Sequence, residues 1–225
     1  MTFSLAGRCE RTGMLGAAVT TSSIAVGARC LHARAGVGAA MSQNITDPSL
    51  GPALLDLMAA GRSAAEAVSA VVESAPDIEF RQLTAVDTGG GTGHFTGSKT
   101  LGVHGVDCGD DCVAAGNLLA HTGVPEAMVR TFRTRPGDHL AERLLAGLEA
   151  GLGAGGEAGP AHSAALLVVD RVSWPLVDLR VDWDDGCPVT ALRRLWKQYC
   201  PQMDDYVVRA LNPSAAPSYG VAGDP

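Results

Sequence analysis

The chain has 225 residues, of which 46% are hydrophobic, and this length and composition suit one domain with a large core. The formal charge of −7 and only two lysines, Lys99 and Lys197, argue against nucleic-acid binding, because phosphate binding needs clustered basic side chains. The sequence contains no basic segment followed by an apolar run and no apolar stretch of about 18 residues, so it predicts a cytoplasmic protein without a membrane partner.

Short strands with alternating hydrophobic residues open the chain. Residues 1–6 and 15–20 have this pattern, and further strands are expected at 30–34 and 36–42. Turns that contain glycine join these strands. The pattern therefore places the first residues of the chain in a sheet, where a terminus is held rather than frayed.

Two helices are expected next. The apolar spacing within 48–60 is that of an amphipathic helix, and Gly61 ends it. Ser63-Ala64-Ala65-Glu66 has the pattern of a capping box, so a second helix is expected from there to about Ser74. Both helices are predicted to cover one face of a sheet.

Two local motifs suggest ligand binding, and each has a plainer interpretation. The glycine run at 89–93 lacks the Gly-Lys-Ser/Thr of a phosphate-binding loop, so it is predicted to be the turn of a hairpin between strands 80–87 and 94–97. The pair Cys108 and Cys112 has no second Cys/His pair at metal-ligand spacing, so free thiols are favoured over a metal site or a labile disulfide.

The second half of the chain continues the alternation of strands and helices. Strands are expected at 112–118, 163–170 and 176–181, helices at 125–134, 138–152, 188–199 and 203–211, a glycine-rich connection at 151–160, and a mobile tail at 212–225. This order of elements predicts an α+β fold in residues 1–211. The expected architecture is a four-layer αββα sandwich, in which two antiparallel sheets pack face to face and helices cover both outer faces.

Thr2 is the strongest catalytic candidate. If Met1 is removed, Thr2 carries a free α-amine beside its own hydroxyl, and an α-amine with a pKa of about 7.7–8.0 is partly neutral at working pH. One residue then supplies both a nucleophile and the base that activates it. The plainer interpretation is that many cytosolic proteins lose Met1 before a small residue with no catalytic consequence.

Short segments spread along the chain carry a resemblance to a known family. They are Thr2–Ser4, Ala25–Gly27, Ala33–Gly38, Asp47–Gly51, Arg81–Leu83, Thr96–Gly97, Gly116–Leu119, Ser163–Leu166 and Asp178–Asp182. Their order and spacing, from residue 2 to about 199, resemble the bacterial family of unknown function DUF1028, which is grouped with the N-terminal nucleophile (Ntn) hydrolases. The resemblance implies the αββα sandwich and hydrolysis of a small-molecule amide through an acyl-enzyme on Thr2. It also implies that Arg34, 32 positions later, is a basic residue that tunes the Thr2 amine.

Further residues are candidates for contacts with the substrate or with the oxyanion of the reaction. Ser4 shares a strand face with Thr2, since side chains repeat every second residue, and Asn117 offers both a donor and an acceptor for orienting the site. The full set of these candidates is Ser4, Thr21, Ser22, Gln43, Asn117 and His162. No cofactor or metal is expected, because the six histidines are scattered and no ligand motif occurs. A Ser-His-Asp triad stays open, although no Gly-x-Ser-x-Gly elbow is present.

Two other functions stay open. In 157–162 the family pattern of an acidic residue, an arginine and Gly-x-Gln-Ser is replaced, so that the arginine is missing and His162 stands for the glutamine. This departure, together with the absence of a lysine near position 34, keeps a non-catalytic binding or assembly module in view. Acyl transfer to an amine would use the same residues as hydrolysis. A homodimer is also open, since no sequence feature fixes the symmetry.

Overall fold

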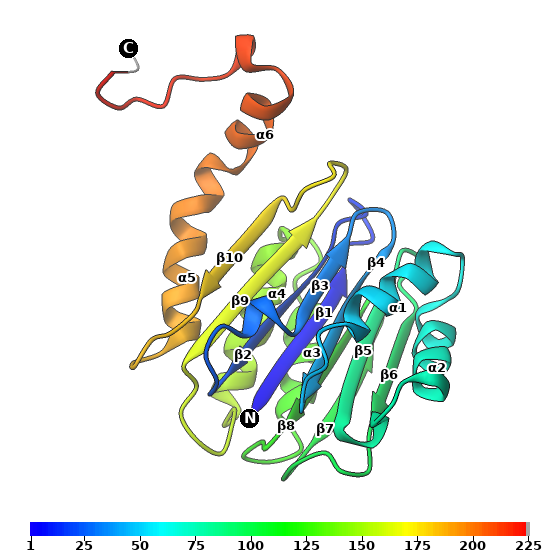
Figure 1. Cartoon of the computed structure of the whole chain (residues 1–225). Helices are drawn as coiled ribbons and strands as arrows, with labels where there is room; N and C mark the ends of the chain where they lie inside the picture. The colour runs from blue at the N-terminus through cyan, green and yellow to red at the C-terminus, as the bar shows by residue number, and fades with distance from the viewer. Residues whose placement is uncertain (224–225) are drawn as a thin grey trace.

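Two antiparallel sheets form the interior of the molecule (Figure 1). The computed structural model describes residues 1–223. The larger sheet has the strand order β10-β9-β2-β1-β8-β7, and the smaller has the order β3-β4-β5-β6. The strands are β1 (Thr2–Arg8), β2 (Leu15–Thr21), β3 (Leu31–Arg34), β4 (Gly38–Asn44), β5 (Arg81–Asp87), β6 (Thr92–Thr96), β7 (Gly105–Gly109), β8 (Cys112–Asn117), β9 (Ser163–Val169) and β10 (Val177–Val181).

Helices cover the outer faces of both sheets. The smaller sheet carries α1 (Leu50–Ala59) and α2 (Ala64–Ser74), and the larger carries α3 (Val124–Arg133), α4 (Leu140–Gly153) and α5 (Pro188–Tyr199) (Figure 1). A last helix, α6 (Met203–Leu211), extends beyond the sheets. The expected α+β class and the two antiparallel sheets are confirmed. The capping box is confirmed too, because Ser63 and Glu66 bond each other's backbone N–H groups.

Strand β1 shows how the sequence separates the layers. Phe3 and Leu5 are fully buried among the helices on the outer face of the larger sheet, whereas Ala6 packs between the two sheets. Alternation along the strand puts Thr2 and Ser4 on the same side as Ala6, facing the smaller sheet. Burial of Phe3 and Leu5 contributes roughly 2 kcal/mol each to folding. This burial fixes the position of Ser4, which lies between them.

Both local motifs turn out to be turns between strands. The amides of Gly89 and Gly91 each donate to Asp87 Oδ1 at 2.9 Å, so the glycine run is occupied in closing the β5–β6 hairpin. Cys108 and Cys112 belong to a β7–β8 hairpin and are free thiols. Strand β7 is absent from the sequence-based expectation, because its glycines and Asp107 do not give a strand pattern.

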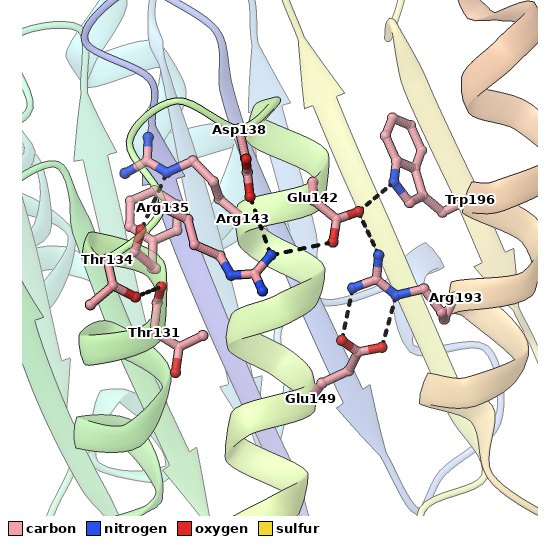
Figure 2. Close-up of polar contacts among 10 residues, drawn as sticks. Thr131, Thr134, Arg135, Asp138, Glu142, Arg143, Glu149, Arg193 and Trp196 are labelled. Atoms are coloured by element: carbon pink, nitrogen blue, oxygen red, sulfur yellow. Dashed lines mark hydrogen bonds and ion pairs between the residues drawn. The ribbon is translucent and has the colours of Figure 1, made fainter.

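Helix α5 is fixed to α4 by a group of charged and polar side chains that we call the α4–α5 clamp. Its members are Glu142, Glu149, Arg193 and Trp196 (Figure 2). Arg193 donates two hydrogen bonds of 2.8 Å to Glu149 and one of 2.5 Å to Glu142, and the Trp196 indole donates to Glu142 at 2.9 Å. The clamp holds the last large helix against the rest of the molecule.

The segment after α6 is tied to that helix by Arg209, which donates to the carbonyl of Pro217 and stacks over Tyr219. The mobility expected for 212–225 stays a prediction, and its last two residues lie outside the described range. Within the described residues, no helix has the length and apolar character to cross a membrane.

Candidate functional site around Thr2

Thr2 begins the central strand of the larger sheet. It pairs with Thr21 at the end of β2 and with Asn117 at the end of β8, so hydrogen-bonded strands hold it on both sides. Only 5% of the residue is exposed. The start of the chain is therefore enclosed and fixed in position.

Two hydroxyl groups lie together at the start of the chain, and one of them bonds the peptide carbonyl between Met1 and Thr2. Thr2 Oγ1 is 3.1 Å from Thr21 Oγ1, and Thr21 Oγ1 donates to the carbonyl oxygen of Met1. A hydroxyl donor on a carbonyl oxygen is the contact that stabilises negative charge when such a carbonyl is attacked. The geometry therefore places one hydroxyl donor on the Met1 carbonyl and the Thr2 hydroxyl beside that donor.

A chain of neutral side chains lies below Thr2, between the two sheets. We call it the amide network, and its members are Ser4, Gln43, Gln82 and Asn117. Ser4 donates to Gln43 at 2.7 Å, Gln43 donates to Gln82 at 2.8 Å, and Asn117 donates to the same Gln82 oxygen at 3.3 Å. Gln82 in turn donates to the carbonyl of Gly116 at 3.1 Å.

All members of the amide network are buried, with at most 1% exposure. Buried polar groups are costly unless they are paired, and here each pairs with another strand, so the network fixes the relative position of β1, β4, β5 and β8. Because its members carry no charge, the amide network holds Thr2 in place without placing an ion beside it.

Glu157 is an almost fully buried carboxylate close to the beginning of the chain, with 8% exposure. It is placed by a bridge to Leu119 and by the neighbouring bond from the Ala158 N–H to the carbonyl of Leu118. Burial raises the pKa of Glu157 to about 8, while the positive charge at the N-terminus and the Ser22 backbone act to lower it. The N-terminal charge and the Glu157 carboxyl group therefore interact.

A cavity of about 250 Å³ opens beside these residues. Its lining includes Phe3, Glu157, Pro160 and Val189. Gly159 also lines it and receives the Met1 side chain, since a Cβ on Gly159 would lie only 2.8 Å from Met1 Cε. The cavity thus combines an apolar wall with one acidic group at the place where residue 1 lies.

The structure brings five of the sequence-predicted residues together: Thr2, Ser4, Thr21, Gln43 and Asn117. The backbone of Ser22 lies beside Glu157. The ring of His162 stacks on Trp183 at 4.3 Å, and its backbone N–H donates to the carbonyl of Thr21. His162 therefore supports the end of β2 through its backbone, while its ring rests on Trp183.

Arg34 does not lie near Thr2, and the role expected for it has to be corrected. Its guanidinium pairs with Asp56 of α1 at 2.8 Å on the exposed surface. Arg34 is paired with Gly38 at the start of β4, whereas Gln43, which reaches the site, is five residues further along that strand, or about 17 Å. The spacing in sequence gave no information about which end of the strand the arginine occupies.

Two residues of the site were missed from sequence. Gln82 lies in a segment expected as a strand, but it stands between Arg81 and Leu83, so its neighbours in sequence do not mark it as a buried amide. Glu157 lies in a glycine-rich connection, where no periodicity indicates burial. Among residues 1–223, no three His, Cys, Asp or Glu side chains gather closely enough to hold a metal ion.

The family profile of DUF1028, described as a family of unknown function, matches residues 2–192. The chain belongs to the DUF1028 family. A solved structure of another DUF1028 protein, SPO2555 from Silicibacter pomeroyi, is 31% identical, with a TM-score of 0.82 over 88% of each chain. The DUF1028 segment thus includes every member of the amide network and Glu157.

A second solved structure, Anbu (ancestral beta-subunit) from Yersinia bercovieri, is 11% identical over 90% of this DUF1028 chain and 96% of its own. Its TM-score is 0.38, which is too low to support an argument about fold or function. Among curated proteins, no sequence matches this chain.

Proposed function

We propose that this DUF1028 protein is an Ntn-type amidohydrolase in which cleavage of the Met1–Thr2 bond frees the Thr2 amine. The observation that carries the proposal is the enclosed pair of hydroxyls, in which Thr2 Oγ1 lies 3.1 Å from Thr21 Oγ1 and Thr21 Oγ1 donates to the carbonyl of Met1. The face-to-face sheets with helices outside them agree with the αββα sandwich of the Ntn hydrolases.

The reaction begins when the neutral Thr2 amine takes the proton of its own hydroxyl, and Thr2 Oγ1 attacks the carbonyl carbon of a small-molecule amide. A C–O bond forms, and Thr21 Oγ1 donates to the developing oxyanion. The C–N bond then breaks as the proton passes from the Thr2 amine to the leaving nitrogen. Water, deprotonated by the same amine, hydrolyses the ester and restores the Thr2 hydroxyl.

The protein contributes position rather than charge to this step. The amide network holds β1 beside β4, β5 and β8, so the nucleophile and its oxyanion donor keep their geometry without reorganisation. Arg34 has no part in the mechanism, since it lies on β3 beside the start of β4, at the end of that strand away from Gln43.

The test is turnover of a panel of small amides by protein whose loss of Met1 has been verified by intact mass. We expect Thr2→Ala to lower kcat/KM at least about 1000-fold, and Thr2→Ser to retain activity within about tenfold, because the serine keeps both the hydroxyl and the amine. Thr84→Val is a matched control, since Thr84 is a buried strand threonine whose hydroxyl has no partner among the described residues. Equal turnover by Thr2→Ala and the starting protein would rule the mechanism out.

A non-catalytic binding module is the second candidate function. Its supporting observation is that Thr21 Oγ1 is occupied by the Met1 carbonyl, so the site is closed while residue 1 is in place. Retention of Met1 on the purified protein, read by intact mass, would favour this alternative. Acyl transfer would be shown by an amide or hydroxamate product formed with an added amine or hydroxylamine in place of the free acid.

A further inference from the structure

Glu157 is a buried acid that the proposed mechanism does not use. Neither carboxyl oxygen has a hydrogen-bond partner among residues 1–223, although the residue is only 8% exposed. A buried carboxyl group without a partner costs free energy, so such groups are usually paired or bind a ligand. Its position beside the start of the chain suggests what that ligand is.

Met1 is held near Glu157 at two points, and its amine lies within electrostatic reach of that carboxyl group. Its carbonyl accepts the hydrogen bond from Thr21, its side chain rests on Gly159, and its charged α-amine acts on Glu157. Met1 is itself an α-aminoacyl group joined through an amide bond to the nitrogen of Thr2. The carbonyl and the side chain thus contact different parts of the site, and Glu157 is the acidic group nearest in effect to the amine.

We infer that Met1 marks the position of the substrate's acyl group, so that the site takes amides of α-amino acids and Glu157 binds their ammonium group. This inference rests on the proposed function of Thr2. The cavity beside Met1 accommodates the side chain of the amino acid, and its apolar wall, which includes Phe3, Pro160 and Val189, fits an unbranched apolar chain such as that of methionine.

The chemistry of Glu157 gives this site its selectivity. Burial raises the pKa of the Glu157 carboxyl group to about 8, so an ammonium group that binds there displaces the carboxyl proton to solvent and forms an ion pair with the carboxylate. An acetylated amine carries no charge and adds bulk at an enclosed position. A ligand without the amine leaves the buried carboxyl group unpaired. The free amine is therefore the feature that separates good ligands from poor ones.

The test is calorimetric binding to Thr2→Ala protein whose loss of Met1 has been verified, so that no ligand is hydrolysed, with three ligands: L-methioninamide, N-acetyl-L-methioninamide and the des-amino analogue 4-(methylthio)butyramide. We expect L-methioninamide to bind at least tenfold more tightly than the other two. Glu157→Gln should reduce that preference to less than threefold and leave the Kd of the des-amino analogue unchanged. Glu126→Gln, at an exposed position of α3, is the matched control and should keep the full preference.

Equal affinity for the three ligands, or no measurable binding of L-methioninamide at millimolar concentration by folded protein, would overturn the inference. So would an equal loss for all three ligands in Glu157→Gln, because Glu157 would then shape the site and not bind the ligand.

Turnover separates this inference from the proposed function. Cleavage of N-acetylated amides in preference to free aminoacyl amides, abolished by Thr2→Ala, would keep the Thr2 mechanism and refute the ammonium site. Binding that depends on the free amine and on Glu157, without cleavage of any amide, would keep the ammonium site and refute the Thr2 mechanism.

Discussion

The amide network and the α4–α5 clamp are both polar clusters that join separate elements, but they differ in charge and burial. The amide network is neutral and at most 1% exposed, and it lies between the two sheets. In the clamp, a guanidinium and two carboxylates lie between two helices, and the side chains are 16–41% exposed. The neutral cluster thus lies where water is excluded, and the charged cluster lies where water reaches it.

The difference shows which kind of cluster can lie beside a reactive residue. Charges in the clamp remain partly hydrated, so their pairing stabilises the α4–α5 contact only modestly. Neutral amides in a dry interior have no water molecule to replace a lost partner. Each lost hydrogen bond therefore costs free energy, and the side chains keep one arrangement. Glu157 is the exception near Thr2, since it is a buried acid whose carboxyl oxygens have no hydrogen-bond partner in the described part of the chain.

The largest effect is expected when the amide network loses its central member. Gln82→Met keeps the volume but removes the acceptor of the Gln43 and Asn117 amide groups and the donor to the carbonyl of Gly116, so it should lower the free energy of unfolding by roughly 5 kcal/mol. Chemical denaturation measures this value. Gln202→Ala, at an exposed glutamine, is the control, and a similar small change in both variants would mean that the network is not tightly coupled.

The next prediction concerns the buried acid Glu157. Burial raises the pKa of Glu157 to about 8, so the folded state keeps a proton that the unfolded chain releases near its ordinary pKa of 4.5. The folded protein therefore loses stability as pH rises from about 4.5 to about 8, by roughly 4 kcal/mol. Glu157→Gln should remove this loss, so the difference between the two proteins should grow through that window and level off above it. Parallel stability curves from pH 5 to 8 would contradict the expectation.

A smaller effect is expected in the clamp. Arg193→Ala removes three hydrogen bonds to Glu142 and Glu149 at a partly exposed site, so it should cost roughly 2 kcal/mol of unfolding free energy. Arg194→Ala, its exposed neighbour, should change stability by less than about 0.5 kcal/mol. Denaturation of both variants checks the comparison, and a loss in Arg193→Ala as large as in Gln82→Met would remove the distinction between the clusters.

The smallest effect is expected at Arg34. Its pair with Asp56 is exposed, so Arg34→Ala should change stability by less than about 0.5 kcal/mol. Because the arginine is far from Thr2, amide turnover should stay within about twofold of the starting protein. A loss of activity comparable to that of Thr2→Ala would restore the role that the sequence assigned to Arg34.

The strands and helices, and part of the site, follow from local patterns. Alternation along β1 is enough to put Ser4 on the same face as Thr2, and the capping box fixes the start of α2. The contacts of Gln82 depend on how the two sheets face each other, which no single strand encodes. Arg34 was misplaced for a related reason, because a spacing along the chain does not give a direction along the strand.

The position of β1 has a practical consequence for anyone preparing this protein. Since the first residue of the strand lies between Thr21 and Asn117 with almost no exposure, an affinity tag fused ahead of it has to leave through the space that Met1 fills. Under the proposed function, such a fusion would both block the Thr2 amine and obstruct entry of the substrate. A purification handle placed after α6, which extends away from both sheets, avoids both problems (Figure 1).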